Sequence, residues 1–272
     1  MKDPMMHLSI AHCTELGSRE NNQDFIGFCA NEHIGCFALA DGAGGYEGGA
    51  EASRAVVSEV LRCFQTAPAA RCMDAAWPIA VARGALATAR ERHPGCGEMN
   101  TTVATLLIST ETGRATWCQL GDSRIYLFRN GRAHKLSHDH SVLQAMIDAG
   151  FVRGDLRGRQ ERNALYAAVG SPETPPTAVC DSPLPVLQGD VFLLCSDGFW
   201  DALPEAVMEE ELRGAATPEE WVKRMLSRIK RPACESDMDN FSALAVWVGK
   251  RIEVTRILDL GEKDVGRVAW QA

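Results

Sequence analysis

The stretch that decides the fold is Leu39-Ala40-Asp41-Gly42-Ala43-Gly44-Gly45-Tyr46-Glu47-Gly48-Gly49. The apolar run at residues 34–40 leads into it and predicts a short buried strand that ends at Asp41. Five glycines among the eight residues after Asp41 allow the backbone to turn sharply and to approach a ligand closely. The stretch therefore predicts a strand, a carboxylate at its end and a glycine-rich turn.

A helix is expected after this turn, over residues 50–64. Its apolar side chains recur every four residues and form one stripe, made of Ala52, Val56, Val60 and Phe64. A carboxylate at a strand end, followed by exposed backbone carbonyls, suits a hard cation such as Mg²⁺ or Mn²⁺. The alternative is a plain turn with a solvated aspartate, because a glycine-rich loop alone is weak evidence for a site.

The composition is that of a globular protein with room for one large domain or two small ones. The 272 residues are 46% hydrophobic and 24% charged, and the net charge of −8 argues against nonspecific binding to nucleic acids or anionic membranes. No apolar run reaches the roughly 18 residues of a membrane-spanning helix, and the N-terminus lacks the apolar core of a signal peptide. The ten cysteines include no C-x-x-C pair, which disfavours zinc ribbons and fits a reducing cytoplasm.

Strands and helices are predicted along the rest of the chain from its apolar periodicity. Strands are expected at residues 8–13, 25–30, 101–109, 114–120, 124–128, 190–196 and 241–248. Helices are expected at residues 77–92, 141–149, 204–212 and 218–229. Turns at residues 111–113 and 129–132 have hairpin character, so the strands between residues 101 and 128 are interpreted as an antiparallel meander.

Five aspartates lie at the ends of predicted strands, namely Asp24, Asp41, Asp122, Asp197 and Asp239. Such carboxylates can converge at one edge of a β-sandwich, where they would repel one another unless cations hold them. A two-metal cluster can activate a water near neutral pH and clamp a phosphoryl group, and Arg19 could grip the phosphate oxygens. Each aspartate alone is also a common turn residue, and spacing alone does not prove convergence.

Six motifs occur in order and resemble the metal-dependent Ser/Thr protein phosphatases, the PPM or type 2C family, in its compact bacterial form. The motifs are Arg19-x-x-Asn22-x-Asp24, Asp41-Gly42-x-Gly44-Gly45, Gly121-Asp122-Ser123-Arg124, Leu136-Ser137-x-Asp139-His140-Ser141, Ser196-Asp197-Gly198-x-Trp200-Asp201 and Asp239-Asn240. The resemblance covers roughly residues 8 to 248. It implies an α+β fold, a four-layer α-β-β-α sandwich of two antiparallel sheets flanked by helices, with a metal site at one end.

The resemblance also implies a domain organisation and a set of site residues. A catalytic domain would span residues 1–250, with a flap at 148–180 and a tail of unknown role at 251–272. Two Mn²⁺ or Mg²⁺ ions would be bridged by Asp41 and bound by the Gly42 carbonyl, Asp197 and Asp239. A third, weaker ion would use Asp122 with Asp197. Asp24 would hold metal-bound waters, and Arg19 would bind phosphate.

The sequence departs from the family's pattern at a few positions. Ala43 stands where many eukaryotic relatives carry a histidine that is proposed as a general acid, so the leaving oxygen would take its proton from elsewhere. Gln23 replaces an acid found in some relatives, and Ser242 replaces a threonine. The pair His138-x-His140 suggests a metal site, but a structural role in the turn before the next helix is favoured.

The function expected from the resemblance is hydrolysis of phosphoserine and phosphothreonine by a metal-bridging hydroxide, in opposition to a bacterial Ser/Thr kinase. The partners would be phosphorylated proteins and the kinase, and the enzyme would be a cytoplasmic monomer. One alternative is a catalytically weak member that acts as a phosphoprotein-binding regulator, which the intact ligand positions disfavour. Another is a phosphatase acting on a regulator such as an anti-sigma antagonist. Ala43 and the small size also resemble phosphatases encoded with type VI secretion systems.

Overall fold

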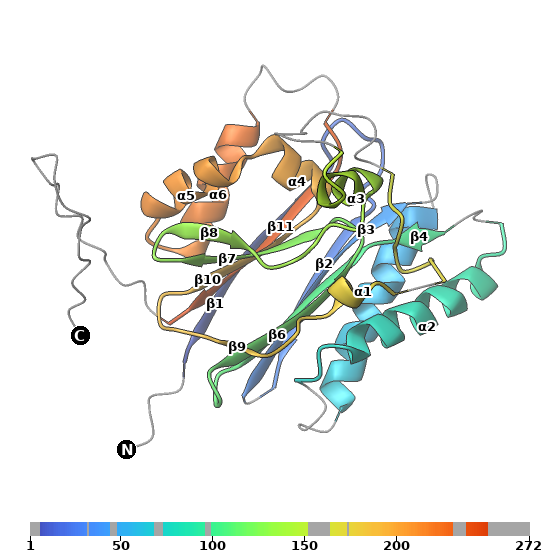
Figure 1. The fold of residues 1–272 in the computed structure, drawn as a ribbon, viewed down its shortest axis with the longest axis horizontal. Coiled ribbons are helices and arrows are strands. Elements are labelled where there is room, and N and C mark those ends of the chain that lie inside the picture. Colours follow the sequence, from blue (N-terminus) through green and yellow to red (C-terminus); the bar gives the residue numbers. More distant parts are fainter. Residues whose placement is uncertain are drawn as a thin grey trace, which may run out of the picture.

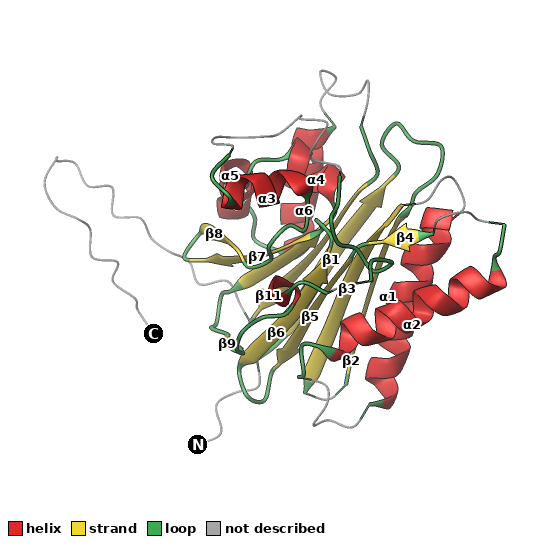
Figure 2. Ribbon diagram, turned by 45° about the vertical axis from the view of Figure 1, so that its right-hand side comes forward, coloured by secondary structure: helices red, strands yellow, loops and turns green. Residues whose placement is uncertain are grey.

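The computed structural model describes residues 6–31, 33–43, 48–67, 73–95, 99–151, 164–172, 174–230 and 238–249. Within them, two antiparallel sheets pack face to face, and helices cover both outer faces, as Figures 1 and 2 show. The predicted four-layer α-β-β-α sandwich is confirmed. Much of the predicted flap and the whole predicted tail lie outside the described residues.

The first sheet has the strand order β2-β3-β5-β6-β9, with β4 paired to the end of β3. Its strands are β2 (Asp24–Ala30), β3 (Ile34–Ala43), β4 (Asn100–Thr101), β5 (Val103–Ser109), β6 (Arg114–Leu120) and β9 (Leu184–Pro185). Its outer face is covered by α1 (Gly48–Thr66) and α2 (Trp77–Arg92). The predicted stripe from Ala52 to Phe64 is buried there, because it packs on β3.

The second sheet has the order β1-β11-β10-β7-β8. Its strands are β1 (Leu8–Glu15), β7 (Arg124–Arg129), β8 (Arg132–Lys135), β10 (Val191–Cys195) and β11 (Phe241–Val248). Its outer face packs against α4 (Asp197–Ala202), α5 (Glu205–Arg213) and α6 (Pro218–Ile229). Between the sheets lies a third apolar cluster that includes Phe37, Leu39 and Leu244.

The remaining elements cap the strand ends. Helix α3 (Val142–Asp148) begins after Ser141, whose hydroxyl accepts a hydrogen bond from the Gln144 N–H. A short 3₁₀ turn covers Pro176–Ala178. None of the helices among the described residues is long and apolar enough to cross a bilayer.

The structure corrects the predicted meander. Strands β5 and β6 form one hairpin in the first sheet, and β7 and β8 form another in the second sheet. The turn at Asp122 therefore carries the chain from one sheet to the other instead of joining two neighbouring strands. The hydrophobic pattern could not reveal this crossing, because β6 and β7 would be apolar in either sheet.

Strand β3 is also longer than the apolar run that predicted it. It continues through Asp41 and Gly42 to Ala43, because β4 pairs with Gly42 and Ala43. Asp41 therefore lies within the paired part of β3, near its end, and not beyond the end of the strand. This pairing fixes the backbone that presents Asp41.

Candidate metal centre

Asp24 and Asp41 lie directly opposite each other on β2 and β3. The Gly42 N–H donates to the Gln23 carbonyl at 3.1 Å, so that pair is a hydrogen-bonded one. The next pair along an antiparallel ladder, Asp24 with Asp41, is then the non-hydrogen-bonded type, in which facing side chains come closest. Leu39, two residues before Asp41, belongs to the core between the sheets. The two carboxylates therefore share the inner face of the first sheet, at its end.

The backbone of Asp41 is fixed by the turn between β4 and β5. Its N–H donates to Thr102 Oγ1 at 2.9 Å, and its carbonyl accepts from the Thr102 N–H and the Thr101 hydroxyl, each at 2.8 Å. Thr102 Oγ1 also lies 2.7 Å from Ser123 Oγ. Because Ser123 follows Asp122, this chain of contacts ties the Asp41 and Asp122 segments together.

Glycines allow the loops of the site to touch backbone to backbone. A Cβ at Gly42 would overlap the carbonyl of Gly49 in the first turn of α1. A Cβ at Gly198 would overlap the Asn240 carbonyl, and one at Gly17, where φ is +60°, would overlap the Asp239 carbonyl. These glycines let the end of β3 touch α1, and let the Gly198 and Gly17 segments touch the segment that carries Asp239.

Arg19 contacts the segment that carries Asp239. Its guanidinium Nη2 lies 2.8 Å from Asp239 Oδ2, and the two side chains are 61% and 41% exposed. The loop of Arg19 is fastened by two further bonds between Ser18 and Met238, one from each N–H, at 2.7 and 3.0 Å. An exposed, always-charged guanidinium is thus held at the rim of the carboxylate group.

Asp24 is almost fully buried, and its two oxygens differ. Its Oδ2 accepts a hydrogen bond from the Ser196 hydroxyl at 2.7 Å, whereas its Oδ1 has no hydrogen-bond partner among the described residues. Burial raises the pKa of Asp24 to about 7, with smaller contributions from Asp197 and Asp239, although its serine hydrogen bonds oppose the rise. An unpartnered buried carboxylate oxygen is suited to bind a water or an ion.

The other carboxylates destabilise one another in the same way. Burial raises the pKa of Asp41 well above its usual range, and four carboxylates raise it further, those of Asp24, Asp197, Asp122 and Asp239. Burial likewise raises the pKa of Asp122, with Asp197 as the next contributor. All five predicted aspartates therefore gather in one region, at the end of the sandwich where α4 and β4 lie in Figure 1.

The residues present fit divalent cations that prefer oxygen ligands. Across the described ranges, no three His, Cys, Asp or Glu side chains already stand at the spacing of a metal's ligands. Mg²⁺ does not need such a cluster, because it is usually bound by one or two carboxylates and keeps several waters. An all-oxygen donor set, mutual repulsion and the orphaned oxygen of Asp24 together favour hard divalent ions here.

The turn that carries Asp122 is braced by residues that sequence reasoning did not assign to the site. The indole Nε1–H of Trp200 donates to the Asp122 carbonyl at 3.0 Å, and the Arg124 guanidinium lies 3.4 Å from the centre of the Trp200 ring. Arg124 in turn grips Asp139 through Nη2 at 2.6 Å and Nε at 3.0 Å. These residues belong to the sequence motifs given above, so the motifs could have identified them.

His140 supports the same turn, so the predicted structural role is confirmed for it. Its Nδ1 accepts from the Gly121 N–H at 3.2 Å, and its Nε2 lies 3.0 Å from Thr177 Oγ1. Burial lowers the pKa of His140 to about 4, which keeps the ring neutral and able to accept. His138 instead lies 2.9 Å from Asp148 at the end of α3. The two histidines therefore face different partners.

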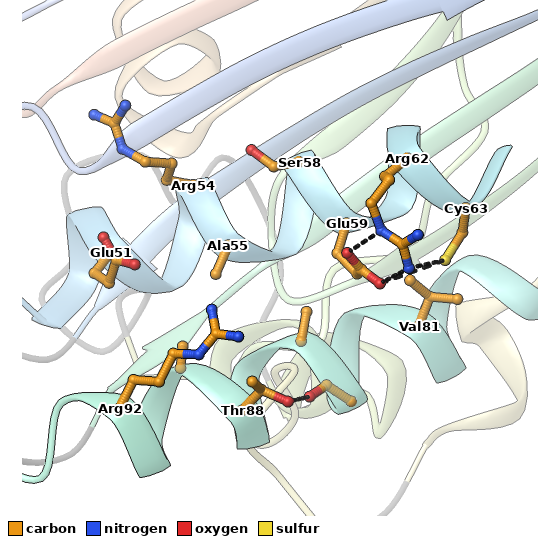
Figure 3. Close-up of a pocket in the computed structure, with 13 residues that line it drawn as sticks. Glu51, Arg54, Ala55, Ser58, Glu59, Arg62, Cys63, Val81, Thr88 and Arg92 are labelled. Carbon is orange, nitrogen blue, oxygen red and sulfur yellow. Dashed lines mark hydrogen bonds and ion pairs between the residues drawn. The ribbon is translucent and has the colours of Figure 1, made fainter. Parts of the chain in front are cut away.

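A separate groove of about 710 Å³ lies between α1 and α2. In Figure 3, Arg54 and Arg62 come from α1 and Arg92 from α2, and Arg62 is held by Glu59. None of the five aspartates lines this groove. It is therefore distinct from the carboxylate region.

Comparisons with known proteins agree with this geometry. A family model described as protein phosphatase 2C matches residues 14–243. The serine/threonine protein phosphatase PstP of Mycobacterium tuberculosis is 29% identical over 199 residues, which are 72% of this chain and 37% of PstP. The serine/threonine phosphatase Stp of Listeria innocua is 26% identical over 235 residues, covering 84% of this chain and 90% of that protein. This chain thus matches little more than a third of PstP and most of Stp.

Solved structures show the same architecture. The catalytic domain of PstP, in complex with two manganese ions, is 25% identical with a TM-score of 0.73, and the match covers 90% of this chain and 100% of that one. PppA, described as a key regulatory component of the type VI secretion system in Pseudomonas aeruginosa, is 26% identical with a TM-score of 0.67. The match covers 89% of this chain and 98% of that one. The family model spans most of the sequence, and the chain belongs to the protein phosphatase 2C family.

Proposed function

We propose that this chain is a metal-dependent protein phosphatase that hydrolyses phosphoserine and phosphothreonine. The observation that carries the proposal is the gathering of five buried or half-buried aspartates beside the exposed guanidinium of Arg19, with the pKa values of Asp24, Asp41 and Asp122 raised by burial and by their neighbouring carboxylates. Phosphoryl transfer needs positive charge around the phosphate and an activated water. Carboxylates that hold two cations, with an arginine at the rim, meet both needs.

The ligand roles in this proposal are those that the family resemblance implies. Asp41, on which the four other carboxylates act, would hold two Mn²⁺ or Mg²⁺ ions together with the Gly42 carbonyl, Asp197 and Asp239. Asp122, with Asp197, would hold a third ion more weakly. Asp24, behind them, would orient water through its unpartnered oxygen. When bound, such ions supply activation of a water near neutral pH and neutralise charge on the phosphate.

Arg19 would bind the phosphate group of the substrate. Its ion pair with Asp239 is exposed to solvent, so the interaction is worth little and is easily exchanged for another anion. The planar guanidinium can then take two phosphate oxygens at once. Because the loop of Arg19 is tied to Met238, the arginine stays beside Asp239, one of the proposed metal ligands.

The substrates and setting are part of the same proposal. The phosphatase names of PstP and Stp support phosphorylated proteins and a Ser/Thr kinase as partners. The absence of disulfides among the described cysteines supports the cytoplasm, and we propose a monomer there. The likeness to PppA makes proteins of a secretion system the first substrates to test, through the phosphoproteome of a deletion strain.

The test is hydrolysis of p-nitrophenyl phosphate and of a phosphothreonine peptide by the purified full chain. We expect turnover of both with Mn²⁺ or Mg²⁺, loss of turnover in excess EDTA and recovery when the metal is restored. Full turnover after exhaustive chelation would contradict the metal-dependent mechanism. Tight binding of the peptide without turnover in any divalent metal would favour the phosphoprotein-binding regulator instead.

A further inference from the structure

Two cysteines face each other across the hairpin that carries Asp24 and Asp41. Cys29 on β2 is the direct partner of Cys36 on β3. Both are thiols in the structure, and directly opposed residues of an antiparallel pair project from the same face of the sheet. That face packs against α1, where Cys29 Sγ lies 3.9 Å from the Leu61 carbonyl.

The ladder fixes the spacing of this pair. Hydrogen bonds from Asn31 N–H to the Ile34 carbonyl and from Gly42 N–H to the Gln23 carbonyl mark hydrogen-bonded pairs on either side of it. Because pair types alternate along the ladder, Cys29 with Cys36 is also a hydrogen-bonded pair, with Cα atoms about 5.5 Å apart. A disulfide requires Cα atoms roughly 4.4–6.8 Å apart, so this pair can close without moving the backbone far.

The two thiols are not equivalent. Cys29 is half-buried and reaches solvent, whereas Cys36 is fully buried. A hydrogen bond from Cys36 lowers the pKa of Cys29, although burial opposes the change. Because the thiolate is the reactive form of cysteine, Cys29 is the thiol that an oxidant would meet first.

We propose that Cys29 and Cys36 form a reversible disulfide modification site that reacts with hydrogen peroxide. The Cys29 thiolate attacks one peroxide oxygen, the O–O bond breaks, and the products are a sulfenic acid on Cys29 and hydroxide. The Cys36 thiol then attacks the Cys29 sulfur, which forms the S–S bond and releases water. Overall, two thiols lose two electrons and two protons, and one peroxide becomes two waters.

Two other cysteines in the described ranges, on β1 and β10, cannot pair in this way. Cys13 on β1 and Cys195 on β10 are both opposite Ala243 of the intervening strand β11. They are therefore two strands apart, about 9.5 Å, which is beyond the reach of a disulfide. Burial also raises the pKa of Cys13, to about 12, and that of Cys195.

The disulfide would link β2 to β3 at a residue pair five positions along the ladder from the pair of Asp24 and Asp41. A cross-link stabilises a protein mainly by restricting its unfolded chain, and it also holds the two strands together. The oxidised protein should therefore melt at a higher temperature than the reduced protein. Dithiothreitol should restore the lower value.

The experiment treats the full chain with one equivalent of hydrogen peroxide, counts thiols and maps linked peptides by mass spectrometry. We expect the parent to lose two of its ten thiols, with Cys29 linked to Cys36, and to recover them with dithiothreitol. Cys36→Ser should instead leave a sulfenic acid on Cys29 that dimedone traps. Cys29→Ser should form no link and show no rise in melting temperature on oxidation.

Cys63→Ser is the matched control, because Cys63 is a half-buried cysteine of α1 that contacts Glu59 and Arg62. It should form the Cys29–Cys36 link as readily as the parent. A principal link between any other two cysteines, or no link in the parent while Cys29 is oxidised, would overturn the proposal. If Cys36→Ser does not fold, Cys29→Ser still tests the proposal, because its substitution is at the less buried position.

Discussion

Asp139, which is buried, and Asp41, which is half-buried, lie at the same end of the molecule, and their surroundings are opposite. Around Asp139 stand Arg124 and Lys135, which hold its pKa below the usual value even though burial acts to raise it. The pKa of Asp41 is raised by burial and then by four other carboxylates. The first environment completes an ion pair within the protein, whereas the second accumulates negative charge that a bound cation or protonation would relieve.

The difference separates a carboxylate that supports the fold from one that awaits a ligand. Asp139 holds Arg124, which stacks on Trp200, which in turn bonds the backbone of Asp122. Asp139, whose charge is compensated by Arg124, therefore helps to position Asp122, whose charge is not compensated. The predictions that follow test this division, and the largest expected effect comes first.

The first prediction concerns the activity of Asp41→Asn. The substitution keeps the size of the side chain and removes the charge that would bridge two cations, so turnover should fall by more than about a thousandfold, or about 4 kcal/mol. Its metal-free form should be at least as heat-stable as the metal-free parent, because one repelling charge is gone. The parent should gain about 2.7 kcal/mol at a hundredfold excess of Mn²⁺ over its Kd, and the variant much less.

Melting curves with and without Mn²⁺, measured beside turnover, check this prediction. A variant that melts far below the parent without metal would make Asp41 a structural turn residue. A variant that keeps the full Mn²⁺ shift would place the ions elsewhere.

The second prediction is the reverse behaviour of Asp139→Asn. Removing this carboxylate leaves Arg124, whose side chain is only 13% exposed, without its main partner. Breaking a buried pair in this way should cost about 3 kcal/mol of unfolding free energy. The loss should be the same with and without Mn²⁺ in denaturant titrations. An unchanged midpoint would mean that the Arg124 network does not support the fold.

The third prediction concerns Arg19→Ala, which should mainly raise KM. A guanidinium that binds phosphate in both ground and transition states contributes to binding more than to the chemical step, at roughly 1.5–3 kcal/mol. Arg62→Ala is the matched control, since Arg62 is equally exposed and paired with Glu59 on α1. Steady-state kinetics should show the effect for Arg19 only. A collapse of kcat at constant KM would assign Arg19 to the transition state instead.

The smallest expected effect is a pH dependence of the metal-free protein caused by Asp24. Its folded-state pKa of about 7 is above its ordinary value of 3.8, so it stabilises the fold at low pH and loses that contribution as pH rises through 7. Linkage gives a loss of about 1.4 kcal/mol between pH 6 and 8. Asp24→Asn should flatten this slope in chemical denaturation of metal-free protein. A parent that becomes more stable over the same range would contradict the raised pKa.

The bounds of many elements follow from the sequence because they depend on local chemistry. Helices α2 and α6 and strands β6 and β11 begin and end where the apolar periodicity and the flanking prolines and glycines predict. The strand-end positions of the five aspartates follow in the same way, and the motifs around them identify the family. Helix α4 and the short strands β8 and β9 were not predicted, because such short segments carry too few residues for a period to show.

Only the tertiary structure decided which of these residues meet. The passage of the chain from β6 to β7 between the sheets places Asp122 beside Asp197, and the register of β2 with β3 sets Asp24 opposite Asp41 and Cys29 opposite Cys36. Asp122 and Asp139 are both buried, yet one faces carboxylates and the other faces Arg124 and Lys135. Lys135 is four residues from Asp139, but the carboxylates that face Asp24 and Asp41 come from distant parts of the chain, where strand register and sheet order determine which side chains meet.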